Sequence, residues 1–393
     1  ASYGQTGNQE GIRLYDYIQL LKFRDDGWGT KLIYPFGNGS QSQAMGLDVL
    51  AGVDRTWEIL ENVNVGVDAA FLDSRLGFSF DYFVKMNNNM LIPVTYPSML
   101  GAEAPYSNSG KLRTNGFELT LNWTDKIGNV EYSAQFQLTD AVNKLVEYGG
   151  ADTYKLGLNE TREGYPMNSY FAYVYDGVIK DQADLDAYKK LEGVPSNIGI
   201  GDAKFKDLNG DGKISTYGDK DGDDGDAEYV GSTTPRYSFG LNLGAKWNNF
   251  DISVFFQGVA KRTLFREGDF AMPWSDWWRY PPQFYYGQTW NEDRPDAYYP
   301  RLTHGEIRHW NYQASTLQKI NAAYIRLKNI QIGYTLPKGA LQKLGIERTR
   351  FYVSGQDLFE IHNVKGGWDP ESDKAGFNYP FQRYYSFGID LTF

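Results

Sequence analysis

The chain has 393 residues, of which 16% are aromatic and 43 are glycines, with three histidines and no cysteine. Its formal net charge of −10 argues against nucleic acid as a partner, and so few His and Cys residues give nucleophilic catalysis little support. No run approaches the roughly 18 apolar residues of a transmembrane helix, although alternating strands hide a lipid-facing side from hydropathy averages. Ala1 opens no signal-peptide pattern, so a mature or truncated amino terminus is expected.

Several segments of the chain alternate apolar and polar residues with a period of two, which is typical of strands that have one apolar face. Residues 1–62 alternate poorly and are expected to be extracellular or rim material. The nine predicted strands are 63–69, 76–82, 117–123, 130–138, 237–245, 250–258, 324–334, 351–359 and 385–393. The sequence therefore predicts an all-β fold with successive strands antiparallel.

The last predicted strand, 385–393, carries the alternation to a terminal aromatic residue. One face carries Tyr385, Phe387, Ile389, Leu391 and Phe393, and the other carries Ser386, Gly388, Asp390 and Thr392. Nine residues suffice to cross a bilayer at a steep tilt. A soluble edge strand has the same pattern, so the connections between strands must separate the two interpretations.

The connections between the predicted strands alternate in length. Short connections fall at 72–75, 124–129, 246–249 and 335–350, and long ones at 87–116, 139–236, 259–323 and 360–384. Outer-membrane barrels have short periplasmic turns and long extracellular loops, whereas a soluble β-sandwich with insertions has no reason to keep them at one end. We therefore expect a transmembrane antiparallel β-barrel with residues 1–62 and the four long connections outside. Nine strands are odd in number, whereas single-chain outer-membrane barrels have even numbers and an open sheet would expose unpaired backbone groups to lipid, so the chain is expected to be a part of a barrel.

The longest connection contains a predicted short surface helix and an acidic loop. The helix covers residues 183–191 after Asp181, a plausible cap. The loop has oxygen-bearing side chains at alternating positions and a glycine at position 6, as in the first three-quarters of a calcium loop. Position 12 is Gly218 instead of the expected Glu, so Asp219, Asp221 or Asp223 would have to substitute. The candidate Ca²⁺ ligands are Asp207, Asn209, Asp211, Lys213, Ser215 and Asp219. A metal-free turn stabilised by its own Asx side chains is the alternative.

Aromatic residues crowd the connection 259–323. Flat rings next to amides and carboxylates grip sugars by stacking or peptides by burying side chains. Packing within the loop, or an interface with another protein, explains the same residues. The candidate substrate-binding residues are Trp274, Trp277, Trp278, Tyr285, Tyr286 and Trp290.

An ordered series of short motifs resembles the SusC/RagA-like TonB-dependent transporters of the Bacteroidetes outer membrane. The similarity runs over almost the whole chain. The motifs are Ser2-Tyr3-Gly4-Gln5-Thr6-Gly7-Asn8, Trp57-Glu58 with Asn64-Val65-Gly66-Val67-Asp68 and Asp81-Tyr82-Phe83, Phe205-Lys206-Asp207-Leu208-Asn209-Gly210-Asp211-Gly212, Thr234-Pro235-Arg236-Tyr237-Ser238-Phe239-Gly240, Tyr324-Ile325-Arg326-Leu327-Lys328-Asn329, Gly333-Tyr334-Thr335-Leu336-Pro337 and Asp369-Pro370-Glu371.

The resemblance implies that residues 1–393 are the carboxyl-terminal part of a barrel of about 22 strands, with the amino-terminal barrel portion and plug domain absent from this chain. It also implies outer-membrane lipid as surroundings, TonB acting through the plug, and a SusD-like lipoprotein as a lid over loops 139–236 and 259–323. The expected function is TonB-dependent import of an oligosaccharide or peptide, without catalysis. A calcium-braced, surface-exposed glycan-binding β-protein without transport activity is the alternative.

Overall fold

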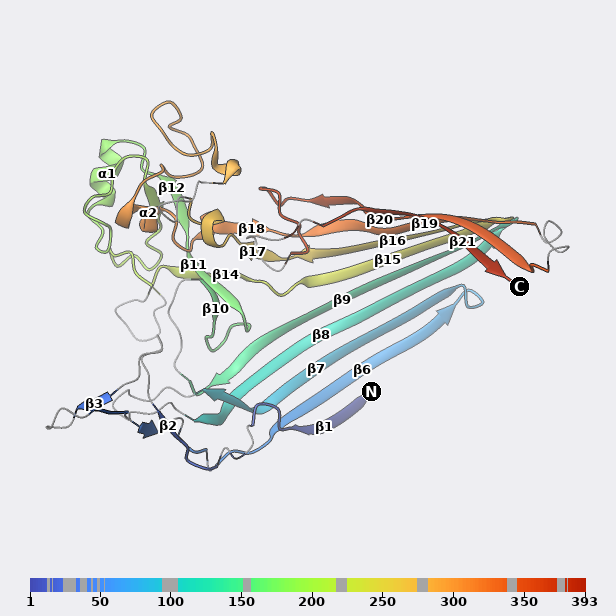
Figure 1. Cartoon of the computed structure of the whole chain (residues 1–393), viewed down its shortest axis with the longest axis horizontal. Helices are drawn as coiled ribbons and strands as arrows, with labels where there is room; N and C mark the ends of the chain where they lie inside the picture. The colour runs from blue at the N-terminus through green and yellow to red at the C-terminus, as the bar shows by residue number, and fades with distance from the viewer. Residues whose placement is uncertain are drawn as a thin grey trace.

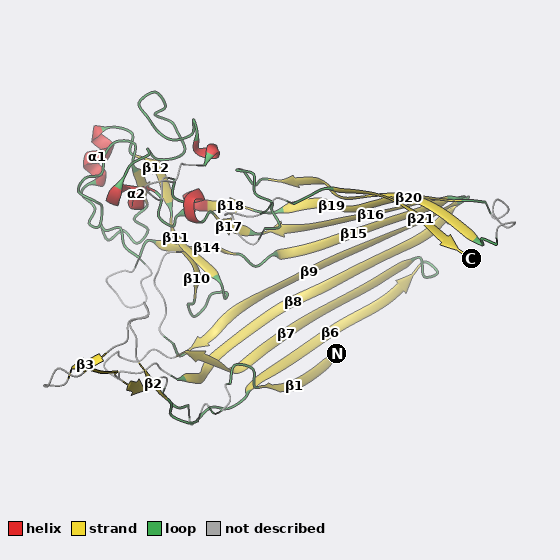
Figure 2. Cartoon of the chain, viewed as in Figure 1, coloured by secondary structure: helices red, strands yellow, loops and turns green. Residues whose placement is uncertain are grey.

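The structure is a computed structural model that describes most of the chain. The described residues are 1–12, 15, 17–23, 33–35, 41–43, 45–47, 50–52, 54–93, 105–150, 157–216, 225–273, 282–337, 345–372, 379 and 381–393. Long strands form one curved wall, and shorter elements gather at one end of it (Figures 1 and 2).

The wall is a single ten-stranded sheet in the order β1-β6-β7-β8-β9-β15-β16-β19-β20-β21, and all its pairings are antiparallel. Among the described residues, β1 and β21 are its two edges. The strand bounds are β1 Ser2–Asn8, β6 Glu58–Phe71, β7 Leu76–Pro93, β8 Tyr106–Ile127, β9 Val130–Tyr148, β15 Arg236–Trp247, β16 Phe250–Lys261, β19 Tyr324–Thr335, β20 Arg348–His362 and β21 Tyr384–Thr392.

The predicted strands are all present, but their number and several bounds were wrong. Residues 2–8 form a tenth strand paired with β6, so the assignment of all of 1–62 to the rim fails. The argument from an odd strand number fails with it. Strand β7 runs on to Pro93 and β8 begins at Tyr106, so the loop predicted at 87–116 is much shorter. The additional strand residues include the polar runs Asn87-Asn88-Asn89 and Ser107-Asn108-Ser109, which interrupt the alternation of hydropathy and hide these parts of the strands.

The pairing register aligns the alternation of neighbouring strands into one apolar face and one polar face. Val65 lies opposite Tyr82, and Tyr82 opposite Phe117. At the other edge, Ile332 lies opposite Val353, and Val353 opposite Phe387. Because the side-chain period is two, a slip of one residue would turn every apolar side chain to the polar face. The apolar face carries exposed side chains such as Phe387, which is 83% exposed.

Tight hairpins join the strands at the end of the wall away from the loops. Gly128 (φ +58°) begins the two-residue turn between β8 and β9, and Asn248 (φ +52°) begins the one between β15 and β16. Two-residue hairpins need positive φ at the first turn position, which Gly and Asn adopt at low cost. Trp247 and Phe250 flank the second turn and stack at 6.3 Å between ring centroids. Exposed aromatic residues at a strand end are typical of the membrane-interface belt.

The remaining elements belong to the connections that join the wall strands at the opposite end of the wall, which we call the loop end (Figure 1). No described helix is long and apolar enough to cross a bilayer. These elements are β2 Leu21–Phe23, β3 Ile33–Pro35, β4 Gln41–Gln43, β5 Met45–Leu47, β10 Gly157–Glu160, β11 Ser169–Tyr173, β12 Tyr175–Val178, α1 Gln182–Tyr188, β13 Ala203–Phe205, β14 Ala227–Ser232, β17 Thr263–Phe265, α2 Gly305–Asn311 and β18 Lys319–Asn321, with 3₁₀ turns at Gly268–Phe270, Gln283–Tyr285 and Thr316–Gln318.

Helix α1 confirms the predicted surface helix and its cap. The carboxylate of Asp181 accepts a hydrogen bond from the backbone N–H of Asp184 at 2.9 Å. The helix ends at Tyr188, three residues before the predicted end. Leu185 and Tyr188 turn inward to a cluster that includes Ile179 and Ile307. The helix therefore attaches one loop segment to another.

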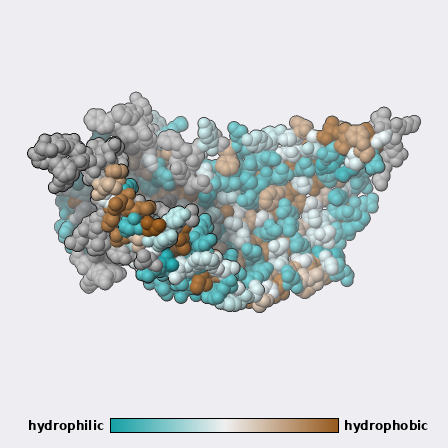
Figure 3. Space-filling view, turned by 60° about the horizontal axis from the view of Figure 1, so that its bottom comes forward, coloured by the Kyte–Doolittle hydropathy of each residue, from teal (hydrophilic) through white to brown (hydrophobic). Residues whose placement is uncertain are grey.

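Figure 3 shows one face of the molecule, on which hydrophilic residues cover most of the strand region and hydrophobic residues gather in separate patches. Most fully buried apolar side chains belong to the loop end, not to the wall. The buried clusters there include Leu264 with Ile320, Tyr170 with Phe265, and Phe205 with Ala203. The loop end therefore has a core of its own.

Candidate substrate-binding site in the loop domain

The described segments within 157–235, 262–323 and 363–372 pack into one unit, which we call the loop domain. The indole N–H of Trp310 donates to the backbone oxygen of Ala203 at 2.9 Å, and its ring packs on Phe205. Trp368 and Val364 pack on Leu264. These three connections are therefore held together by a shared core.

A buried ion pair fastens the first two segments of the loop domain to each other. The guanidinium of Arg301 donates two hydrogen bonds to the carboxylate of Asp202, at 2.6 and 2.8 Å. The backbone N–H of Gly199 and the side-chain amide of Asn311 also donate to this carboxylate. Asp202 is fully buried, and these donors offset the cost of burying its charge. The hydrogen bond from Arg301 to Asp202 raises the pKa of the guanidinium.

A second ionic cluster fastens the third segment to the polar face of the wall. Arg326 of β19 is 1% exposed and pairs with the carboxylates of Asp369 and Glu371. Lys328 on the same strand pairs with Glu371 and with Asp357 of β20, the latter at 2.8 Å. This arrangement folds the segment 363–372 back over the strand ends.

Tyr285 and Tyr286 are adjacent but have opposite environments. Tyr285 is 2% exposed, packs edge-on against Tyr299 at 4.8 Å, and donates its hydroxyl to the backbone oxygen of Phe270 at 2.7 Å. Burial raises the pKa of the Tyr285 hydroxyl. Tyr286 is 89% exposed. Tyr285 therefore packs in the core and also lines the pocket beside Tyr286, and substrate contact stays a prediction for both residues.

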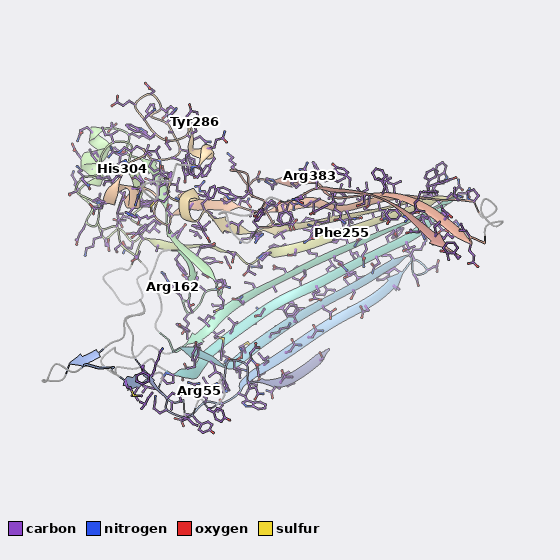
Figure 4. The ribbon with its side chains drawn as sticks, viewed as in Figure 1. Arg55, Arg162, Phe255, Tyr286, His304 and Arg383 are labelled. Carbon is purple, nitrogen blue, oxygen red and sulfur yellow. The ribbon has the colours of Figure 1, made fainter. Side chains whose placement is uncertain are left out.

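Tyr286 lies at the edge of a surface pocket of about 590 Å³, which we call the loop pocket. Pro282, Arg294 and Leu302 also line the loop pocket. Figure 4 places Tyr286 in the loop domain, far from the hairpin end of the wall. Pockets of roughly 300–1,000 Å³ that combine apolar walls with a few polar groups are typical of small-ligand sites. The exposed ring of Tyr286 and the guanidinium of Arg294 are among the groups here that can contact a solute.

Trp290 packs inside the loop domain at its contact with the first segment. A Cβ atom added to Gly201 would lie 2.2 Å from the Trp290 ring, so the indole requires a glycine there. The backbone N–H of Trp290 donates to the backbone oxygen of Tyr299 at 2.8 Å. Trp274, Trp277 and Trp278 lie outside the described residues, and their roles stay predictions.

The acidic loop folds around hydrogen bonds from its own backbone. Asp207 accepts the N–H groups of Gly210 and Gly212, and Asp211 accepts that of Lys213. Asn209 likewise accepts the N–H of Asp211. Such Asx hydrogen bonds can stabilise the loop without a metal, which is the alternative interpretation. Each carboxylate oxygen nevertheless keeps a second lone pair that could bind a cation.

Asp226, which the sequence did not indicate, closes the acidic loop. Its two oxygens accept the N–H groups of Leu208, at 2.6 Å, and of Ser215, at 2.9 Å. Burial raises the pKa of Asp226, and the charges of Asp207 and Asp211 add to this rise. A nearby cation would offset this unfavourable charge, so the donors fit calcium chemistry. Asp219 lies outside the described residues, and among the described ones no three His, Cys, Asp or Glu residues form a metal-binding group. The calcium site stays a prediction.

An aromatic ring, Phe255, lies on the polar face of the wall. Phe255 of β16 lies opposite Asn242 and Asn329, and its place midway along the strands is visible in Figure 4. Gln135 and Asn122 line the same groove of about 470 Å³. Phe255 breaks the hydropathy alternation, which is the only signal in the sequence that could have indicated it.

We compared the sequence and the fold with those of known proteins. No protein-family model matches the chain. It is 26% identical over its full length to TonB-dependent receptor P3 of Formosa agariphila and 26% identical to TonB-dependent receptor P26 of the same bacterium. The chain spans 39% of the length of each of these curated relatives. The structure of the RagAB peptide transporter superposes on the whole chain with a TM-score of 0.74 at 23% identity, covering 40% of that chain. A second RagAB structure, in a "closed-closed" state, gives a TM-score of 0.72.

The chain is similar over its whole length to TonB-dependent receptors, and its fold is that of the RagAB transporter, which fits the resemblance to the carboxyl-terminal part of a SusC/RagA-like transporter. Its ten-stranded wall is a portion of a transmembrane antiparallel β-barrel, as predicted, with the apolar face toward lipid. The curated proteins that match the whole of this chain are named receptors, and none of these names is that of an enzyme.

Proposed function

We propose that the transporter containing this chain imports an oligosaccharide or a peptide across the outer membrane. The observation that carries this proposal is the combination of a lipid-facing wall with a loop domain that has its own core and an open pocket at one end of the wall. Full-length similarity to TonB-dependent receptors supports it. A solute too large for porins binds at the loop end and passes inward when TonB acts.

The described residues supply the wall and the outer binding surface in this proposal. Because the chain spans about two-fifths of its relatives, the plug and the other strands belong to the rest of the transporter. The loop pocket receives the solute, with Tyr286 and Arg294 as its contacts. The exposed side chains Tyr298 and Leu302 extend this surface toward a SusD-like lipoprotein that acts as a lid.

Uptake in the native bacterium tests the proposal. Strains with and without the gene for the whole transporter take up fluorescently labelled oligosaccharides or peptides, and a strain without TonB serves as the energy control. The proposal predicts uptake of at least one solute class that needs both the transporter and TonB, and co-purification of a surface lipoprotein. Binding without uptake would instead favour a surface glycan-binding protein. Equal uptake in all strains would contradict the proposal.

A further inference from the structure

A second cavity, distinct from the loop pocket, lies where strands β9, β15 and β16 meet the loop domain. It has a volume of about 240 Å³ and is lined by residues of six strands. Four of its lining residues are cationic: Arg236, Lys261, Arg262 and Lys319. None of its described lining residues is an Asp or Glu, so the formal charge of the lining is +4 in a chain whose net charge is −10.

The fold brings these cations together although they come from separate segments. Arg236 begins β15 and lies directly opposite Lys261, which ends β16. Lys319 reaches the cavity from β18, and Arg262 lies between β16 and β17. Like charges directly opposite each other in neighbouring strands are destabilising. The arrangement therefore needs compensating negative charge.

The protein compensates only part of this charge. The carboxylate of Asp140 of β9 accepts hydrogen bonds from Nε and Nη2 of Arg236, at 2.5 and 2.6 Å. Among the described residues, no carboxylate forms an ion pair with Lys261, Lys319 or Arg262. Arg262 donates to the backbone oxygen of Pro370 at 2.7 Å, which fixes its guanidinium. Its buried Nε atom has no acceptor in the described part of the chain, and a buried donor without a partner costs free energy.

We propose that this cationic cavity binds an anionic group, a carboxylate or a sulfate, of the imported solute. Guanidinium and ammonium groups form their strongest hydrogen bonds with such oxyanions. The volume is below the roughly 300–1,000 Å³ of pockets that enclose whole ligands, so a single substituent fits. Polar lining from Asn143, Ser232 and Thr234 supplies further contacts. The origin of the anion, though not the existence of the site, rests on the proposed import function.

Titration of the purified whole transporter with inorganic sulfate, at constant ionic strength in chloride, tests the site. We expect saturable binding that weakens at least about tenfold in the double variant Lys261→Gln/Lys319→Gln, because both ammonium groups are exposed and charge-assisted bonds depend on them. The matched control Lys190→Gln/Lys246→Gln removes two exposed lysines elsewhere and should bind sulfate like the wild type. No saturable binding, or equal binding in the two double variants, would overturn the site.

Paired solutes test the source of the anion. A peptide with a free carboxyl terminus is compared with its amide, and a uronate oligosaccharide with its methyl ester. For at least one pair, the charged member should be bound and imported in preference by the wild type but not by the double variant. If no pair shows this preference, the assignment of the anion to the solute is wrong. The assignment is also wrong if lipid A co-purifies with the wild type and is lost from the double variant. If the wild type imports nothing, the import proposal fails while the sulfate titration still decides the site.

Discussion

The wall and the loop domain follow opposite rules for their apolar side chains. In the wall, large apolar side chains are exposed along one face, as with Val65, Ile332 and Phe387. In the loop domain they are buried in clusters that combine residues from different connections, such as Phe205 with Trp310. A wall of this kind is stable because lipid covers its apolar face and hydrogen-bonded pairing satisfies its backbone. The loop domain behaves like a water-soluble fold.

This difference separates the two tasks of the molecule. The wall repeats one rule across ten strands and offers few places where a solute could be distinguished. The loop domain holds the loop pocket, and the cationic cavity lies where it joins the wall. Specificity is therefore expected to depend on loop residues, whereas stability in the membrane depends on strand residues.

The largest effect is expected from replacing Tyr285, and its neighbour Tyr286 provides the comparison with an exposed ring. Tyr285→Ala removes a fully packed ring and should destabilise the loop domain by about 3–5 kcal/mol. Tyr286→Ala should change stability by less than about 0.5 kcal/mol and weaken solute binding. Hydrogen exchange of the loop segments measures the first effect, and solute titration the second. Equal loss of protection in both variants would contradict the assigned environments.

A matched pair in β15 tests the wall. Leu243 lies on the apolar face and Asn242 on the polar face, and both side chains are exposed. Leu243→Arg should cost about 2–4 kcal/mol, the price of a cation facing hydrocarbon, and less if the site lies near the interface. Asn242→Arg should cost far less. Urea unfolding in lipid vesicles measures both, and similar values would show that the apolar face does not contact lipid.

The cap of helix α1 gives a smaller effect within the loop domain. Asp181→Ala removes the acceptor for the N–H of Asp184 and should cost about 1 kcal/mol. The control Asp181→Asn keeps a capping oxygen and should retain most of the stability. Hydrogen exchange in residues 182–188 reports the difference, which should not spread to the wall. An unchanged exchange rate in Asp181→Ala would mean that packing alone holds the helix.

The acidic loop should respond most weakly, and its response depends on pH. Because the pKa of Asp226 is raised above its usual value of 3.8, the folded loop loses stability as pH rises through the folded pKa. Bound calcium would lower this pKa and remove the loss. If the calcium prediction holds, Ca²⁺ should slow hydrogen exchange of residues 207–216 at neutral pH, and Asp207→Asn should abolish the effect. The same exchange in Ca²⁺ and in chelator would reject the metal.

The wall could be predicted from the sequence and the loop domain could not, for a physical reason. A strand facing lipid must alternate, so residues such as Phe387 and Ile389 indicate their own environment. Strand β1 was missed because residues 2–8 hold only one large apolar side chain, Tyr3. In the loop domain, the role of each residue depends on partners far away in the chain. Asp202 and Arg301 are 99 residues apart, and nothing local indicates that they pair.

The same limit applied to the candidate site. Local composition grouped Tyr285, Tyr286 and Trp290 as one aromatic cluster, but only their tertiary contacts separate a core ring from an exposed one. The cationic cavity was missed because its residues come from distant segments that no pattern connects. By contrast, the cap at Asp181 is a local signal and was predicted correctly.

Spin labels along β21 test the inside-out character of the wall most directly. The chain has no cysteine of its own, so single cysteines at 385–391 can be labelled in the whole transporter within lipid vesicles. Accessibility to oxygen, which enters lipid, and to a water-soluble nickel complex is measured at each position. Accessibility to oxygen should exceed accessibility to nickel at Tyr385, Phe387, Ile389 and Leu391. At Ser386, Gly388 and Asp390, accessibility to nickel should be the higher of the two, or both should be low because the label is buried. Accessibility without this alternation, or with the two faces exchanged, would contradict the account.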